Sequence, residues 1–441
     1  MADIFEKIKS FLNQDKSEHG FTTADSPSCF CNMYGAKEKI KQAEEDCKKA
    51  LEVNPQHADA HVCMGRVNVS KGDIDEAIRN FKKATELNPG YIDAFFCLGE
   101  AYCYNGDLDS AIDMLNKVIQ KNPAYTNAYI MLGRVYIRKE KLNDALEYYK
   151  KAVSMHPEYA DAHFGLGGVY ANLGMLAEAQ KEHKKALKIN PNYADAKTGL
   201  GWIYYLRGNL KDAEKEFLGV MQIKPNESDI YTGLGWVYYR QEKLEDAETE
   251  FLKAREIRNE DVDAYVGMGW VYYRMFIHGQ PSLEGAEKEF KKAIDINPNY
   301  ADAHIGLGWV YYHKENLELA EKNFLKAIEI NPDYADVHIG LGWVYYRWVY
   351  YNKEKLAEAE KEFARAIEMS PSNPEPHVGM GWVLYRNNKL GEAEKSFMKA
   401  RKLKSDYADA YIGIASVYEK RGDKKKAEAE YKKARKYHIG N

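Results

Sequence analysis

Residues 194–227 read ADAKTGLGWIYYLRGNLKDAEKEFLGVMQIKPNE, and residues 228–261 follow with SDIYTGLGWVYYRQEKLEDAETEFLKAREIRNED. The two stretches align without a gap, and Gly201 and Gly235 occupy the same place in each, 34 residues apart. The same interval separates glycines through most of the chain, with two longer steps of 39 residues that end at Gly308 and Gly381. A period of 34 residues is typical of a helix–turn–helix unit copied along a solenoid. We therefore expect an all-α array rather than a globular enzyme.

Numbering this glycine as position 8 gives eleven full repeats, each made of a first helix, A, and a second helix, B. Position 20 is alanine in every repeat, and position 24 is usually aromatic. Small residues at positions 8 and 20 predict a close approach of helices A and B. The acidic residue at position 2 is expected to cap helix A, and a proline near the end of most units to stop helix B. The repeats begin at Ala58, Ile92, Thr126, Ala160, Ala194, Ser228, Val262, Ala301, Ala335, Pro374 and Ala408.

The repeat resembles the tetratricopeptide repeat (TPR) family. One copy shows the matching residues as Gly201, Tyr204, Ala213, Phe217 and Pro225, and the resemblance covers residues 58–441. It implies antiparallel helix pairs stacked into a right-handed TPR superhelix, an α-solenoid of about eleven repeats whose A helices line a concave groove. It also implies a binding or scaffolding role without catalysis.

The two ends of the array differ. Residues 1–35 are expected to form an amphipathic helix and a polar linker, residues 36–57 a degenerate half-repeat with its helix over 37–53, and residues 58–441 the array. Charged side chains give −2 over residues 1–57 (8 basic, 10 acidic) and +4 over residues 408–441 (9 basic, 5 acidic). A head-to-tail contact that does not close would produce a filament. The residues expected to mediate it are Ile4, Phe5, Ile8, Phe11, Leu12, Lys424, Tyr431 and Arg435.

Composition narrows the class of protein. The net charge of −4 gives no electrostatic signature of nucleic-acid binding, and no apolar run is long enough for a membrane span. The first residues do not resemble a signal peptide, so a cytoplasmic location is expected. We expect the six cysteines to be reduced and mostly buried, with a metal or disulfide role as the alternative. No cofactor or metal site is predicted, and the recurrent histidines at position 4 are interpreted as packed or partly exposed side chains of helix A rather than as metal ligands.

Repeats 5–10 carry an aromatic ladder on helix A, with Trp at position 9, Tyr at position 12 and mostly Arg at position 13. One interpretation is that these rings stack on one another and stiffen the array. The other is a groove for an extended partner, because Trp, Tyr and Arg dominate binding hot spots. The ladder residues are Trp202, Tyr205, Trp236, Tyr239, Arg240, Trp270, Tyr273, Arg274, Trp309, Tyr312, Trp343, Tyr346, Arg347, Trp382, Tyr385 and Arg386.

Two insertions interrupt the period. Residues 343–352 contain a tandem duplication that is expected to lengthen helix A or to form a bulge, and residues 275–282 are expected to form a longer loop between helices A and B. The sequence thus predicts a non-enzymatic scaffold for protein partners that self-assembles through its ends. The alternative is a monomeric adaptor or assembly chaperone that binds a client in the concave groove.

Overall fold

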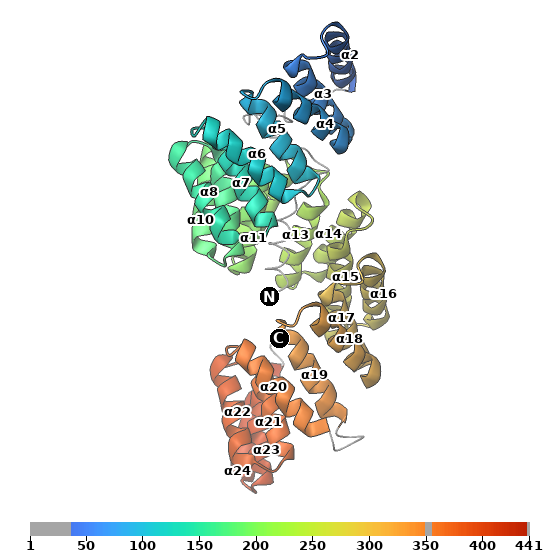
Figure 1. Cartoon of the computed structure of the whole chain (residues 1–441). Helices are drawn as coiled ribbons and strands as arrows, with labels where there is room; N and C mark the ends of the chain where they lie inside the picture. Colours follow the sequence, from blue (N-terminus) through green and yellow to red (C-terminus); the bar gives the residue numbers. More distant parts are fainter. Residues whose placement is uncertain (1–36, 349–354, 439–441) are drawn as a thin grey trace. The chain divides into compact units, whose positions relative to one another are not determined.

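In the computed structural model, residues 37–348 and 355–438 are described, and every regular element among them is an α-helix. The chain divides into two units, residues 1–233 and 234–441, with the boundary inside one helix. Within each unit, helix A packs on helix B of the same repeat, and helix B packs on the next helix A. The helices therefore appear as successive pairs, such as α15 with α16 and α17 with α18 (Figure 1). This all-α arrangement confirms the fold class.

The A helices are mostly thirteen or fourteen residues long. They are α3 (Ala58–Lys71), α5 (Ile92–Tyr104), α7 (Thr126–Arg138), α9 (Ala160–Asn172), α11 (Ala194–Leu206), α13 (Ser228–Arg240), α15 (Val262–Ile277), α17 (Ala301–His313), α19 (Ala335–Trp348), α21 (Pro374–Arg386) and α23 (Ala408–Lys420).

The B helices complete the pairs, and α2 stands before the first full repeat. They are α2 (Lys37–Val53), α4 (Ile74–Leu87), α6 (Leu108–Lys121), α8 (Leu142–Met155), α10 (Leu176–Ile189), α12 (Leu210–Met221), α14 (Leu244–Ile257), α16 (Leu283–Ile296), α18 (Leu317–Ile330), α20 (Leu356–Met369), α22 (Leu390–Leu403) and α24 (Lys424–His438). The division of the sequence into domains stays a prediction.

The core of the array is a row of side chains from position 24 of helix B. Phe217 is fully buried between two A helices, and a Cβ atom on Gly201 or Gly233 would lie 3.1 Å or 2.7 Å from its ring. Gly201 is position 8 of the same repeat, and Gly233 is position 6 of the next. The recurrent glycine thus leaves room for a buried ring as well as for the expected close approach of helices A and B. One ring packs against both neighbouring A helices, so it joins successive repeats.

The insertion in repeat 7 mainly extends a helix. Helix α15 is 16 residues long, and a short turn follows with Gly279 in the left-handed region at φ 88°. The Ser282 hydroxyl donates to the carbonyl of Tyr272 over 2.7 Å and fixes this turn. In repeat 9, α19 continues to Trp348, and the rest of that insertion lies outside the described residues.

Candidate functional site

The ladder tryptophans pack into the array. Trp309 lies edge-on to Tyr312, with ring centroids 5.7 Å apart, and edge-on to Phe324, at 5.5 Å. The same pair of contacts recurs at Trp202, Trp236, Trp270, Trp343 and Trp382. Trp202 and Trp236 are each only 5% exposed, and the other four are half-buried. Each indole therefore links its own helix to the buried ring at position 24.

The position-13 cations stack on the tyrosine of the preceding repeat. Arg347 lies over the ring of Tyr312, 5.1 Å from its centroid, and donates to the carbonyl of Tyr312 over 3.1 Å. It also pairs with Glu315 at 2.7 Å. Arg274, Arg386 and Lys420 repeat the stack on Tyr239, Tyr346 and Tyr385. The cation satisfies the carbonyl end of the preceding A helix, where positive charge is favourable.

Two ladder positions depart from this pattern. His313 replaces the arginine in repeat 8, and its Nε2 atom lies 3.0 Å from the hydroxyl of Tyr273. In repeat 5, Leu206 replaces the cation, and Tyr205 is almost completely buried. Trp202 and Tyr205 belong to the first unit, and the ladder from Trp236 onward belongs to the second. Arg240, at the end of α13, is exposed.

In the second unit, the tyrosines at position 12 form a half-buried row, here called the tyrosine row: Tyr239, Tyr273, Tyr312, Tyr346 and Tyr385. Burial raises the pKa of Tyr239 and Tyr312 above the usual range, and it raises the pKa of Tyr273 more strongly. The hydroxyls of these three tyrosines therefore remain neutral donors and acceptors at physiological pH. A Trp packs edge-on to each ring, and a cation stacks on every ring except Tyr273, which contacts His313 instead.

The acidic residues at position 2 do not cap helix A. The residue before each helix occupies the cap, and for α11 this is Tyr193, which makes no side-chain cap. The Tyr193 hydroxyl instead donates to Asp161 of the preceding repeat over 2.6 Å. Tyr125 and Tyr300 bind Asp93 and Asp263 in the same way. Sequence reasoning missed this inter-repeat bond, although the recurrent Tyr before position 1 signals it.

The bond is interrupted between repeats 9 and 10, where Asn373 stands in place of the tyrosine. Asn373 accepts from the backbone N–H of Glu375 over 3.0 Å and caps α21, and Asp336 is exposed. Burial raises the pKa of Glu375 to about 7, with repulsion from Asp336 and Asp409, and a hydrogen bond from Trp343 opposes the shift. Tyr273 and Tyr312 also sense the charge of Glu375. Two tyrosines of the row therefore lie within electrostatic range of a carboxyl group that titrates near neutrality.

The position-4 histidines tie helix A to the loop before it. His163 bonds Glu182 through Nδ1 at 2.6 Å and the carbonyl of Pro157 through Nε2 at 2.9 Å. His304 bonds Asn323 and the carbonyl of Pro298 with the same geometry. Among residues 37–348 and 355–438, no group of three His, Cys, Asp or Glu side chains could hold a metal ion. These contacts bear out the interpretation of the histidines as packed side chains.

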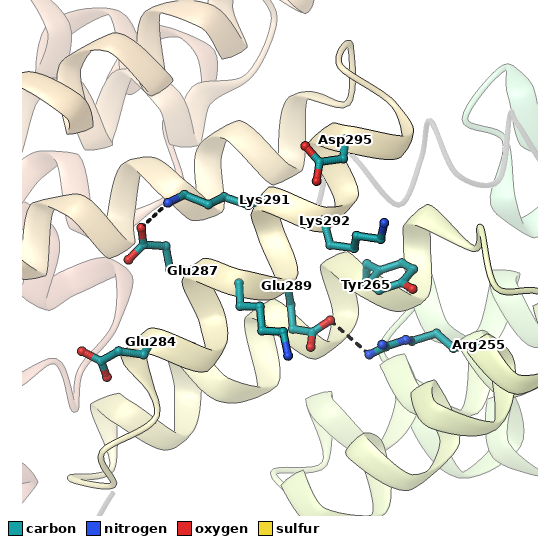
Figure 2. A pocket seen from close by; sticks show the side chains of 9 residues that line it. Arg255, Tyr265, Glu284, Glu287, Glu289, Lys291, Lys292 and Asp295 are labelled. Atoms are coloured by element: carbon teal, nitrogen blue, oxygen red, sulfur yellow. Dashed lines mark hydrogen bonds and ion pairs between the residues drawn. The ribbon is translucent and has the colours of Figure 1, made fainter.

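A hollow of about 510 Å³ lies over α16. Figure 2 shows its rim of charged side chains, in which Arg255 pairs with Glu289 at 3.0 Å and Lys291 pairs with Glu287 at 2.6 Å. Four acidic and four basic side chains line the hollow, so their formal charges cancel. The hollow therefore offers no excess charge of either sign to a ligand.

The residues predicted to mediate self-assembly are only partly described. Ile4, Phe5, Ile8, Phe11 and Leu12 lie outside the described residues. On α24, Lys424 and Arg435 are exposed, and the hydroxyl of Tyr431 donates to Glu419 over 2.9 Å. Between Lys424 and Tyr437, only Ala427 and Ala434 are buried, so this part of α24 presents a polar outer face. None of the helices in the described part of the chain is long and apolar enough to cross a bilayer.

Family models for tetratricopeptide repeats match most of the chain. The model for the TPR domain of cytochrome c-type biogenesis protein H matches residues 47–163, and other repeat models match residues 174–220, 281–315, 301–334, 348–406 and 378–438. The chain is a tetratricopeptide repeat protein. Arrays of this family typically act as non-enzymatic scaffolds for protein partners. No curated protein matches the chain significantly.

Several solved structures are similar to this TPR protein. Cut9, in the Cut9–Hcn1 hetero-tetramer of the APC/C, is 14% identical with a TM-score of 0.55, over 92% of each chain. Human IFIT1, solved as a dimer with PPP-AAAA, is 17% identical with a TM-score of 0.51, over 92% of this chain and 96% of its own. YrrB, described as having an unusual peptide-binding site, is 26% identical over 42% of this chain and 95% of its own, with a TM-score of 0.33. The first two similarities support the fold alone.

Proposed function

We propose that this TPR protein is a non-enzymatic, cytoplasmic scaffold whose tyrosine row binds an extended, positively charged segment of a protein partner. The observation that carries the proposal is that the half-buried Tyr273 and Tyr312 sense the charge of Glu375, a carboxyl group that titrates near neutrality. Both hydroxyls are neutral, a Trp packs edge-on to each ring, and Arg347 also stacks on Tyr312. Binding would therefore cost little conformational entropy of the site, because its side chains are already ordered.

The sign of the partner's charge follows from the acids beside the row. Glu375 carries a pKa of about 7 because it is partly buried and is repelled by Asp336 and Asp409, so its charge is poorly compensated within the chain. A Lys or Arg side chain brought next to this carboxyl would relieve the repulsion. Aromatic faces next to the carboxyl add cation–π attraction. The basic side chains at position 13 are less available to an acidic partner, because Arg347 and Arg274 pair with Glu315 and Glu242.

The test uses labelled synthetic peptides that alternate Lys with small residues, and matched peptides in which Glu replaces Lys. Fluorescence polarisation should show binding of the Lys peptide alone, and affinity should rise with pH as Glu375 ionises near pH 7. The variant Glu375→Gln should lose this pH dependence. Equal binding of both peptides, or a pH profile unchanged by Glu375→Gln, would contradict the proposal.

The choice of ladder variants follows from the burial of the rings. Replacing Trp236, Trp270 and Trp309 by Ala would remove packing against Phe251, Phe290 and Phe324, so lost binding would not distinguish a contact from unfolding. Tyr273→Phe and Tyr312→Phe remove only hydroxyls. Weaker peptide binding by this pair, with an unchanged circular dichroism spectrum, would place the partner on the tyrosine row.

A second candidate function is head-to-tail self-assembly, favoured by the exposed basic side chains on α24. This helix carries seven Lys or Arg and two Glu, whereas residues 1–57 have a net charge of −2. We infer that residues 1–35 of one copy dock on α24 of the next. Deleting residues 1–35 should then lower the mass measured by light scattering, and raising the salt concentration should have the same effect. An unchanged mass would count against self-assembly.

A further inference from the structure

The structure joins Cys47 of α2 and Cys63 of α3 in a disulfide, with Cα atoms 6.3 Å apart. This corrects the expectation of reduced thiols at these two positions, and Cys97 is also disulfide-bonded. The Cα distance lies within the range of about 4.4–6.8 Å that a disulfide accepts without backbone movement. The thiols are therefore already placed to form or break the bond while both helices stay in position.

The register of the repeats shows what this disulfide replaces. Cys47 is position 24 of the half-repeat, and Cys63 is position 6 of repeat 1. Later in the array, the same two positions hold a buried ring and a glycine, as in Phe217 with Gly233 and Phe251 with Gly267. Two cysteine side chains are too small to reproduce that buried ring. Without the S–S bond, the junction between α2 and α3 lacks the side chain that joins other successive repeats.

Most side chains of α2 between Ile40 and Val53 stay at least partly accessible to solvent. From Ile40 to Val53, Cys47 is the only buried residue of the helix, whereas α4 buries Ala77, Ile78, Phe81 and Ala84. Lys71 of α3 pairs with Glu44 of α2 at 2.5 Å, but both side chains are partly exposed to solvent. Exposed ion pairs stabilise a structure only slightly. The covalent bond therefore joins the two helices through the one fully buried side chain of α2 between Ile40 and Val53.

We propose that Cys47 and Cys63 form a thiol–disulfide exchange site that docks α2 on the array when oxidised and releases it when reduced. The co-reactant is a low-molecular-weight disulfide. The half-exposed Cys63 thiolate attacks one of its sulfurs and displaces a thiolate, which gives a mixed disulfide on Cys63. The Cys47 thiolate then attacks Cys63 Sγ and displaces the second small thiolate. Two electrons pass from the protein to the small disulfide, which leaves as two thiols.

The proposal is tested on the full chain by hydrogen exchange with mass spectrometry. The protein is equilibrated either with oxidised glutathione or with dithiothreitol. Amides of α2 should be protected in the oxidised protein and lose that protection on reduction, whereas amides of α14 should be unaffected. Peptide mapping of the oxidised protein should recover a linked pair containing Cys47 and Cys63. Equal protection of α2 in both states, or a map in which Cys63 is linked to a different cysteine, would overturn the proposal.

Two variants distinguish loss of the disulfide from loss of the packing between α2 and α3. Cys47→Ser should leave α2 unprotected under both conditions. The double variant Cys47→Phe with Cys63→Gly installs the ring and glycine used by later repeats, so α2 should be protected whether or not reductant is present. If the double variant does not fold by circular dichroism, Cys47→Ser decides alone, and protection of α2 in that variant contradicts the proposal.

Discussion

Position 9 of helix A carries a charged side chain in repeats 1–3 and an aromatic side chain in repeats 6–10. Position 9 is Arg66, Glu100 and Arg134 in the first group, and tryptophan in the second. Glu100 is 1% exposed, and its charge helps to raise the pKa of Tyr125, after burial and Asp93. The tryptophans instead lie edge-on to the buried rings at position 24. The same repeat backbone therefore accepts either charged side chains or aromatic packing at this position.

The largest expected loss of stability is at the tryptophans of position 9. Trp309→Ala removes contacts with Tyr312 and Phe324, and large-to-small changes of this kind cost about 3 kcal/mol or more. Arg66→Ala, at the same position in repeat 1, should cost less because a smaller apolar surface is lost. The free energies of local opening from hydrogen exchange in α17 and α3 measure both losses. Losses of equal size would show that Trp and Arg stabilise their repeats equally at position 9.

The next effect concerns repeat 4, which lies between the two groups. His183 occupies position 24, is fully buried, and has no hydrogen-bond partner for either ring nitrogen. Burial lowers its pKa to about 4, with Glu182 on the same helix opposing the shift. His183 packs between α9 and α11. The ionisable groups on these neighbours are His163 of α9, which is bonded to Glu182, and Tyr193, which precedes α11 and is bonded to Asp161. His183 thus fills the place that Phe217 and Phe251 fill in later repeats, but with a side chain that can be protonated.

The sign of the pH effect follows from the lowered pKa. The folded state prefers neutral His183, so protonation favours unfolding, and stability falls as the pH drops from about 6.5 toward 4. One unit of pKa shift corresponds to about 1.4 kcal/mol, so the loss near pH 4 should be about 3 kcal/mol. His183→Phe should abolish this component, as measured by exchange of α10 amides against pH. A pH dependence identical in both proteins would show that other groups cause it.

Much of the fold follows from the sequence because the period is so regular. The glycines at position 8 and the alanines at position 20 predict the helix pairs, and the observed A helices begin at residues such as Ala58, Ile92 and Ala408. The histidine contacts were also predictable in kind. A short period fixes which residues are equivalent, and equivalent residues adopt equivalent local structure.

What the sequence could not give is the contact between successive repeats. It did not reveal that Trp202 and Trp236 are nearly inaccessible, or that Tyr193 binds Asp161 one repeat away. Nor did it pair Cys47 with Cys63, since the half-repeat lacks the ring that makes the register visible. Each of these depends on how closely one helix approaches the next, which residue types alone do not specify.

A smaller loss of stability is expected at the cation stacks, in which a charged side chain packs on an aromatic ring. Arg347→Met removes the stack on Tyr312, the bond to its carbonyl and the ion pair with Glu315, and should cost about 1 kcal/mol at low salt. High salt should reduce the cost, because it screens the charged contacts. Exposed Lys361→Met on α20 is the control, with no expected change. Exchange of α17 amides reports the difference, and a cost independent of salt would assign the effect to packing alone.

The smallest effect lies in the turn between helices A and B, where both regions share one strained backbone position. Glu140 in repeat 3 and Glu315 in repeat 8 adopt φ values of 59° and 60°, whereas Gly72 and Gly208 occupy this position in other repeats. Glu140→Gly should stabilise the α7–α8 turn by about 0.5–1 kcal/mol, because a side chain disfavours this conformation. Glu315→Gly should gain almost nothing, because it also loses the ion pair with Arg347. Thermal unfolding of both variants measures the difference, and an equal gain would mean that the Glu315–Arg347 pair contributes nothing to the ladder region.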